Sequence, residues 1–576
     1  MRTVGAPSHF IPTATELFRG CVLAIEYSSI AQDIGDESDL LRTGLEIQKY
    51  RLMSWAQRVG LFHDFGGSHT LDWECAYLIL KQLWTFLTSA DSVQNVFGLT
   101  VIEEDAAASA EEQLLGIQKN GVASIISRLM PDYNEAILRI AQEYESPIQR
   151  FRWVESTTEN KDKLKAFLNG TSILIEELRC LLDSFERARE KEKYLRFLRD
   201  VVSLTTTTAE AGQIRELFEA GRHQRKDEQS IGAAAYVKQV RLYLGAAKRE
   251  DEITPGMASG ITGLVIPRPI LLVNSLRPWD KGGFRASGRE FAMYDGQQVL
   301  IQWKLVESAQ WEGMKRLAYL LKSLSHDSSF QSLPYLGYYT PESAGRHFGI
   351  LYSMPGAGTN WDFRSLQDLI SSQPYAPLER RVKIMQALAE TVLNLHTAGW
   401  VHKSIRPENV IFLAPQGSDG NVFLRSRPYV IGYEHGQLDT VESASTGLEA
   451  NLYRHPQARG TDGEPFQRRF DMYALGCVLV ELATWRPLVD VFASYAADGL
   501  KERIRSSRET NEAIELPSLE DLFGNEDAKN MLAHQAGQAV LEIIRTSYSV
   551  EQAKEGFEWA LEDEADVVEM SAHPRL

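Results

Sequence analysis

One short stretch of the chain gathers side chains that could take part in chemistry. Residues 396–411 read His-Thr-Ala-Gly-Trp-Val-His-Lys-Ser-Ile-Arg-Pro-Glu-Asn-Val-Ile and bring His402, Ser404 and Asn409 close together in sequence. A general base needs a proton affinity that its surroundings can tune toward neutral pH, and a serine hydroxyl lacks it. Ser404 is therefore not expected to accept a proton.

The same stretch resembles the catalytic loop of protein kinases, in which His-Arg-Asp is followed after four residues by Asn. In that family the Asp accepts the proton of the substrate hydroxyl, and the Asn holds a magnesium ion. The resemblance implies that Ser404 stands in place of the Asp. It also implies that Asn409 is a cofactor-binding residue.

Two later segments resemble the kinase fold in order and spacing. Tyr453 to Gln457 resembles the segment that closes the activation loop, and Asp471 to Leu482 resembles the buried helix that follows it. In the family, the Asp of that helix braces the backbone of the catalytic loop. The resemblance covers residues 270–560 and implies a two-lobed protein-kinase-like fold, with strands first and helices after.

A lysine lies at the end of an expected strand in the first lobe. An Asp295-Gly296 turn is expected to join a strand at 291–294 to a strand at 298–304. The resemblance places Lys304 where a kinase lysine pairs with nucleotide phosphates, and so among the cofactor-binding residues. An exposed lysine at a strand end would look the same. Its usual acidic partner is missing at 319–322, and the nearest candidate, Glu312, has a short spacing.

Other groups needed for phosphoryl transfer are missing from their expected places. Residues 281–288 contain glycines but lack the Gly-x-Gly-x-x-Gly spacing that closes over phosphates. Gly432 stands where the metal-binding Asp of Asp-Phe-Gly should be, and Glu434 comes two positions too late. Together with Ser404, these losses indicate a pseudokinase with no catalytic residue and no metal ligand. ATP binding without hydrolysis stays open.

Apolar residues recur at helical spacing through most of the first 200 residues. The pattern predicts helices over 41–59 and 72–87, with Asp72 available as an N-cap, and a longest helix that begins near Lys161. Almost nothing before residue 200 has the pattern of a strand. Helices that are apolar on one side must bury that side, so residues 10–200 are expected to form an α-helical bundle.

The segment between the two halves has a different character. Residues 201–265 are expected to form a partly helical linker, with a helix over 233–244 and a basic run at 221–226. Residues 561–576 are expected to form an acidic C-terminal tail. The predicted fold class is thus a multi-domain protein, α plus α+β.

The helical half resembles the fungal HeLo-domain proteins, including those with a prion-inhibition and propagation domain. Residues 45–61, 151–153, 163–168 and 175–178 carry this resemblance. The family implies a cell-death effector that permeabilises membranes once a partner domain releases it. The layout is also similar to that of mixed-lineage kinase domain-like proteins, in which a pseudokinase restrains a helical bundle.

The first helix of the bundle departs from the strongly apolar one that is frequent in the family. Its apolar residues Leu17, Phe18, Val22, Leu23 and Ile25 are mixed with Glu16, Arg19 and Glu26. An amphipathic helix of this kind can lie in a membrane interface. It can equally lie in the core of the bundle, which is the expectation for the resting state.

The composition of the chain limits which partners and which cellular compartment are expected. The 576 residues are 44% apolar and carry a formal net charge of −17, so no general basic field for nucleic acid is expected. The four cysteines are dispersed, which argues against a disulfide framework or a zinc site. No run of about 18 apolar residues and no secretory pattern appears. A cytoplasmic location is expected, with membrane contact only on activation.

The preferred interpretation is a pseudokinase-regulated signalling protein of the fungal incompatibility or cell-death type. Its expected partners are other proteins and further copies of the chain, which would assemble through the helical bundle. One alternative is an active atypical protein kinase that uses Lys304, Asn409 and Glu434. Another is a non-enzymatic scaffold.

Overall fold

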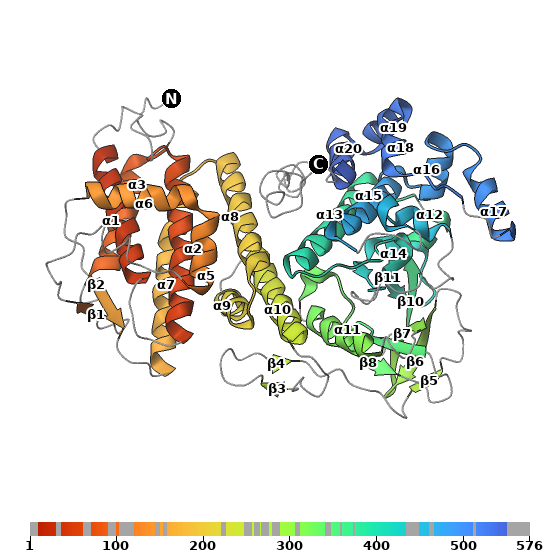
Figure 1. Ribbon diagram of the computed structural model, residues 1–576, viewed down its shortest axis with the longest axis horizontal. Coiled ribbons are helices and arrows are strands. Elements are labelled where there is room, and N and C mark those ends of the chain that lie inside the picture. Colours follow the sequence, from red (N-terminus) through yellow and green to blue (C-terminus); the bar gives the residue numbers. More distant parts are fainter. Residues whose placement is uncertain are drawn as a thin grey trace. The chain divides into compact units, whose positions relative to one another are not determined.

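A computed structural model shows how the chain folds (Figure 1). The structure describes residues 10–29, 36–61, 71–89, 99–102, 120–144, 150–153, 158–219, 226–246, 256–257, 265–266, 276–278, 288–305, 311–325, 327–339, 347–356, 360–372, 375–433, 448–459, 466–510 and 514–549. The chain divides into two compact units, Met1–Gly232 and Ala233–Leu576. The expected linker at 201–265 therefore contributes residues to both units.

The first unit is a helical bundle. Its helices are α1 (Phe10–Ser29), α2 (Asp36–Arg58), α3 (Trp73–Thr88), α5 (Gly121–Leu129), α6 (Pro131–Glu143), α7 (Thr158–Cys180), α8 (Ser184–Leu204) and α9 (Thr208–Glu219). Helix α1 packs against α2 and α3, and α7 packs against the same two helices. The buried side chains of α1 include Phe18, Val22 and Ile25, each at most 1% exposed. The expectation that this helix lies in the core is confirmed for this conformation.

Several sequence predictions for the bundle are confirmed. The helix predicted over 41–59 corresponds to α2, which ends at Arg58, and the longest predicted helix corresponds to α7. Asp72 is the N-cap of α3, where its carboxylate accepts a hydrogen bond from the backbone N–H of Cys75 at 3.0 Å. Since the cap satisfies an amide that the helix leaves without an internal partner, it fixes where α3 begins.

One feature of the first unit was not predicted. Strands β1 (Leu99–Ile102) and β2 (Arg150–Trp153) form a two-stranded antiparallel sheet. Each strand has four residues, and the pairing joins segments about 50 residues apart, so local periodicity carries little sign of it. Helix α9 was likewise missed, because its sequence lies in the segment read as linker.

The helix predicted over 233–244 forms part of the longer α10 (Lys226–Ala246). Its first residues belong to the first unit and the rest to the second. In the second unit, Val237, Val240 and Leu244 join a buried apolar cluster with Leu395 and Ala398. The C-terminal part of α10 is therefore built into the core of the second unit.

The second unit contains a five-stranded antiparallel sheet of order β5-β6-β7-β9-β8. Its strands are β5 (Leu276–Pro278), β6 (Arg289–Tyr294), β7 (Gln297–Leu305), β8 (Tyr335–Tyr339) and β9 (His347–Ser353), with helix α11 (Trp311–Leu324) between β7 and β8. Asp295 and Gly296 form the predicted turn between β6 and β7, and both have positive φ angles, 49° and 73°.

The rest of the second unit is mainly helical. It contains α12 (Leu366–Ser372), α13 (Leu378–Thr397), α14 (Gly420–Arg425), α15 (Arg468–Thr484), α16 (Leu488–Tyr495), α17 (Leu500–Thr510), α18 (Leu519–Phe523), α19 (Glu526–Ala536) and α20 (Gln538–Ser549). A small antiparallel sheet of order β10-β11-β12 lies among them. Its strands are β10 (Trp361–Ser365), β11 (Val410–Pro415) and β12 (Pro428–Val430), and a separate pair is β3 (Gly256–Met257) with β4 (Val265–Ile266).

The predicted fold class is confirmed, because a helical N-terminal part is followed by a part with a sheet first and helices after. The short 3-10 helices η4 (Ser328–Phe330), η5 (Pro407–Asn409), η6 (Ala450–Tyr453) and η7 (Pro456–Ala458) complete the second unit. Within the described part of the chain, no helix combines the length and apolar character needed to cross a bilayer.

Candidate functional site

The loop between α13 and η5 is held by one buried carboxylate. Asp471 of α15 is 1% exposed and accepts hydrogen bonds from the backbone N–H groups of His402, at 2.6 Å, and Lys403, at 2.9 Å. The ring of His396 lies 3.3 Å from the same carboxylate. Lys403 has φ +68°, a left-handed conformation that is unfavourable for a lysine. Asp471 thus braces the loop, as the kinase resemblance implied.

Ser404 lies in this loop and is bonded to Asn409. The amide nitrogen of Asn409 donates to the carbonyl oxygen of Ser404 at 2.7 Å and to its hydroxyl oxygen at 3.1 Å. Ser404 is 8% exposed and Asn409 2% exposed. The hydroxyl that replaces the expected carboxylate is therefore part of a buried hydrogen-bond network.

The amide oxygen of Asn409 is bonded to a cation from the sheet. The guanidinium group of Arg289, at the start of β6, donates to Asn409 Oδ1 and to the carbonyl oxygen of Glu408. Arg289 is 5% exposed, and burial lowers its pKa to about 10, with nearby Arg406 acting in the same direction. The oxygen that the kinase resemblance assigns to magnesium thus accepts a hydrogen bond from the chain's own guanidinium.

Gln302 lies beside Arg289, because the two residues are paired across β6 and β7. Its side-chain oxygen accepts a hydrogen bond from the backbone N–H of Gly432 at 3.3 Å. Lys304 comes two residues later on β7, so it lies on the same face of the strand but about 7 Å further along. Gln302 is therefore a residue of β7 that contacts Gly432.

Gly432 lies close to Asn409 and cannot be replaced without strain. Its φ is +85°, and a Cβ atom placed there would lie 2.4 Å from the amide carbon and oxygen of Asn409. An aspartate at this position, as in active kinases, would meet the same obstruction. The observed position of the Asn409 side chain therefore requires a glycine at position 432.

Replacing Gly432 by alanine is expected to destabilise the second unit by about 2 kcal/mol or more, since it adds a steric clash to an unfavourable φ. Gly417→Ala is a matched control: Gly417 has φ +84° but nothing within 4 Å of its Cβ position. Urea unfolding of both variants would separate the two contributions. Equal losses in the two variants would contradict the proposed contact with Asn409.

The space between the sheet and the loop is lined by buried apolar side chains. Phe291 of β6 contacts Phe363 of β10 edge to face, with ring centroids 5.5 Å apart. Both belong to a single buried cluster with Leu300, Ile431 and Tyr433. The ring of Tyr433 lies 4.3 Å from that of His402, and burial raises the pKa of its hydroxyl far above the usual value. Apolar packing, as well as hydrogen bonding, therefore fills the space between the sheet and the loop.

A second buried carboxylate lies in α15, and it ties η6 to that helix. Glu481 Oε1 accepts hydrogen bonds from the hydroxyl of Tyr453 and from the backbone N–H of Leu488, each at 2.7 Å. Burial raises the pKa of Glu481 to about 8. Because the folded protein keeps this proton up to pH 8 while the unfolded chain loses it near pH 4.5, stability should fall as pH rises between these values.

Glu481→Gln is expected to remove this pH dependence, since the amide oxygen can still accept both hydrogen bonds and the side chain cannot ionise. The stability of the variant relative to the wild type should increase by up to a few kcal/mol between pH 5 and pH 8. Urea unfolding at several pH values measures the difference, with the exposed Glu526→Gln as control. Parallel pH profiles for wild type and Glu481→Gln would refute the assignment.

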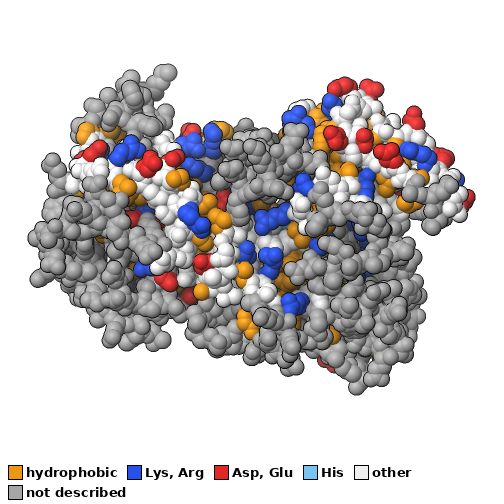
Figure 2. All heavy atoms as spheres, in the orientation of Figure 1, with side chains coloured by type: hydrophobic (Ala, Val, Ile, Leu, Met, Phe, Trp, Pro, Cys, Tyr) orange, Lys and Arg blue, Asp and Glu red, His pale blue; other side chains and the backbone are white. Residues whose placement is uncertain are grey.

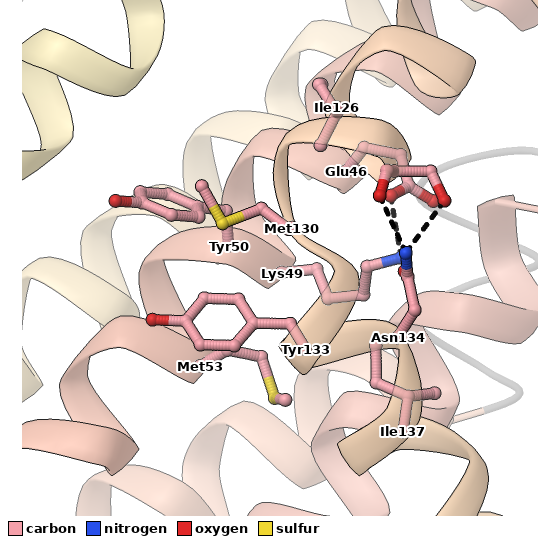
Figure 3. Close-up of a pocket in the computed structure, with 10 residues that line it drawn as sticks. Glu46, Lys49, Tyr50, Met53, Ile126, Met130, Tyr133, Asn134 and Ile137 are labelled. Carbon is pink, nitrogen blue, oxygen red and sulfur yellow. Dashed lines mark hydrogen bonds and ion pairs between the residues drawn. The ribbon is translucent and has the colours of Figure 1, made fainter. Parts of the chain in front are cut away.

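The first unit contains a small hollow between α2, α5 and α6 (Figure 3). Lys49 lines the hollow. Its ammonium group lies 2.7 Å from the carboxylate of Glu46 and also pairs with the carboxylate of Glu26 of α1. Burial would lower the pKa of Lys49, but the two carboxylates reverse this and raise it. The hollow therefore lies beside a buried ionic cluster that joins α1 and α2.

The predicted site residues have different outcomes. The structure brings Asn409 together with Ser404 and Arg289, whereas the role of Lys304 in binding a nucleotide stays a prediction. Glu434 and the side chain of Glu312 lie outside the described residues. Arg289 and Gln302 were missed by the sequence analysis. The only signal was their position on the two strands around the Asp295-Gly296 turn.

Comparison with known proteins finds a family model that matches part of the chain. Residues 11–217, just over a third of the chain, match the HeLo family, described as prion-inhibition and propagation. The matched range lies within the first unit. The helical bundle is therefore similar to the HeLo family over most of its length.

The similarity to protein kinases covers a smaller part of the chain than the HeLo match. Homeodomain-interacting protein kinase 2 of Mesocricetus auratus is 28% identical over 137 residues, which is 23% of this chain and 11% of that protein. Homeodomain-interacting protein kinase 1 of Caenorhabditis elegans is 27% identical over 137 residues, 23% of this chain and 15% of its own length. The chain thus matches only a small part of these relatives. We refer below to the second unit as the kinase-like unit.

Proposed function

We propose that the chain is a signalling protein of the fungal incompatibility or cell-death type, in which the kinase-like unit controls the HeLo bundle without transferring phosphate. The HeLo match supports the effector half of this proposal. The hydrogen bond from Arg289 to Asn409 supports the other half, since it engages the oxygen that a metal–nucleotide complex would need. Ser404 and Gly432, which stand in place of the two kinase carboxylates, also support a unit that transfers no phosphate.

The proposed effector step is an action of the bundle on membranes. The apolar residues of α1 are buried, so membrane contact through them requires α1 to leave the core. That movement separates Glu26 from Lys49, and breaking a buried ion pair costs several kcal/mol. We therefore propose that an upstream partner or ligand of the kinase-like unit supplies this energy, and that released bundles associate with one another.

The test is to compare residues 1–232 with the full chain, at equal concentration, for dye release from liposomes and for toxicity on expression. We expect the fragment to release dye and to be toxic, and the full chain to do so much less. Adding residues 233–576 in trans should reduce release. A fragment that folds, as shown by circular dichroism, yet is inert in both assays would refute the effector role and favour a scaffold.

A second candidate is an active atypical protein kinase, which the similarity to the homeodomain-interacting protein kinases favours. This function would require Lys304 and Asn409 to hold a nucleotide. Arg289 would then have to release Asn409 before a metal ion could bind. The two candidates therefore make opposite predictions about magnesium-dependent phosphate transfer.

A further inference from the structure

The five-stranded sheet and the rest of the kinase-like unit share one buried apolar cluster. Phe291 and Leu300 of the sheet belong to the same cluster as Phe363 of β10 and Ile411 of β11, and each of the four side chains is at most 9% exposed. The kinase resemblance implies that a nucleotide lies between this sheet and the loop that contains Asn409. The chain's own side chains therefore fill the space that a nucleotide would have to enter.

A buried glutamine joins β7 to β10. The side-chain amide of Gln298, which is 9% exposed, donates a hydrogen bond to the carbonyl oxygen of Trp361 at 2.9 Å. It also accepts one from the backbone N–H of the same residue at 2.6 Å. Trp361 is the first residue of β10, which belongs to the three-stranded sheet with β11 and β12. Gln298 therefore joins the two larger sheets of the unit by two hydrogen bonds.

Arg289 makes a second connection between the five-stranded sheet and the rest of the unit. Its guanidinium group donates to Asn409 Oδ1 and to the carbonyl oxygen of Glu408, both in η5. Arginine side chains are rarely buried, and Figure 2 shows charged side chains in their usual place, at the surface over α19. Arg289 is nevertheless only 5% exposed. Its two hydrogen bonds exist only while the sheet lies against the loop.

The side chains that make these contacts lie on one face of the β6–β7 hairpin. Gln298, Leu300 and Gln302 alternate along β7 and so share a face. Phe291 lies opposite Leu300, and Arg289 lies opposite Gln302, which places both on that face as well. The face is thus polar at each end and apolar in the middle. An apolar contact alone tolerates sliding, whereas buried hydrogen bonds at both ends specify one closed position.

We propose that Gln298 and Arg289 form an autoinhibitory latch, which holds the five-stranded sheet against the rest of the unit and keeps nucleotide out. Breaking the latch would leave buried polar groups without partners unless water enters, so the closed form is favoured. A partner that prefers the open form would shift the equilibrium toward it. The latch rests on the part of the proposed function that denies this unit phosphate transfer, and not on the effector role of the bundle.

The test compares the full chain with its Gln298→Met/Arg289→Met variant by hydrogen exchange. Methionine keeps an apolar stem at both positions but makes none of these hydrogen bonds. Exchange in residues 360–365 and 405–413 should become at least tenfold faster, while α15 stays as protected as in the wild type. The matched control is Gln331→Met/Arg427→Met, which removes an exposed amide–guanidinium pair and should change neither segment.

The second measurement is the melting temperature with ATP, with and without magnesium. The wild type should show no shift, whereas the double variant should be stabilised by ATP, because its nucleotide space can open. A shift in the wild type would overturn the latch. Unchanged exchange in the double variant, or faster exchange without a response to ATP, would reduce the two contacts to structural ones. Should the double variant fail to fold, Gln298→Met alone serves both measurements.

Phosphate transfer separates a failure of the latch from a failure of the proposed function. A wild type that responds to ATP but transfers no phosphate would overturn the latch and leave the proposed function in place. Magnesium-dependent transfer by the wild type would overturn both. A response to ATP that is confined to the double variant, together with faster exchange at residues 360–365, is the result that the latch predicts.

Discussion

Replacing Arg289 by alanine is expected to lower the free energy of unfolding of the kinase-like unit by about 3 kcal/mol. The substitution leaves a buried acceptor, Asn409 Oδ1, and a half-buried one, the carbonyl of Glu408, without the donor that they have now. Part of the loss is offset because the buried guanidinium itself is costly to desolvate, as its lowered pKa indicates. Urea unfolding gives the change, and hydrogen exchange of residues 405–413 locates it.

A double-mutant cycle tests whether Arg289 and Asn409 act as a pair. Combining Arg289→Ala with Asn409→Ala should give a coupling energy of about 1–3 kcal/mol. The matched control is the cycle for Arg427 and Gln331, which also joins a guanidinium to an amide oxygen but is exposed. Its coupling should be close to zero. A coupling energy near zero for Arg289 and Asn409 would show that the guanidinium does not hold the amide.

Replacing Asp471 by alanine is expected to have a larger effect, about 4 kcal/mol. It removes the acceptor for the N–H groups of His402, which is buried, and Lys403, which is half-buried. Lys403 also loses the contact that stabilises its positive φ. Chemical unfolding measures the loss, and exchange of the two amides should become much faster.

The control for this substitution is Asp419→Ala. Asp419 also accepts a backbone N–H, that of Val422, but it does so at an exposed helix N-terminus. Its loss should cost only about 1 kcal/mol. If the Asp471 and Asp419 variants were equally stable, Asp471 would not be the brace of the loop.

Features that depend on short stretches of sequence were predictable. The cap at Asp72 and the Asp295-Gly296 turn are fixed by residues within three positions of one another, and both predictions are confirmed. The brace at Asp471 is a long-range contact, and it was expected only because the segments around His402 and Asp471 resemble kinase elements. Its geometry agrees with that resemblance.

The contact that defines the candidate site could not be predicted in the same way. Arg289 and Asn409 are 120 residues apart, and they meet only because β6 pairs with β7 in one register. A shift of one residue would turn Arg289 to the other face of the sheet. The pairing of β1 with β2 escaped prediction for a related reason, since the contact is long-range and the strands are short.

We propose that the kinase-like unit transfers no phosphate, because Ser404 and Gly432 stand in place of two carboxylates and the oxygen of Asn409 is engaged by Arg289. The most direct measurement is magnesium-dependent transfer from labelled ATP by the full chain, with Lys304→Ala and Asn409→Ala prepared in parallel. We predict the same background for all three proteins, with or without magnesium. Transfer by the wild type that requires magnesium and disappears in Lys304→Ala would contradict the claim.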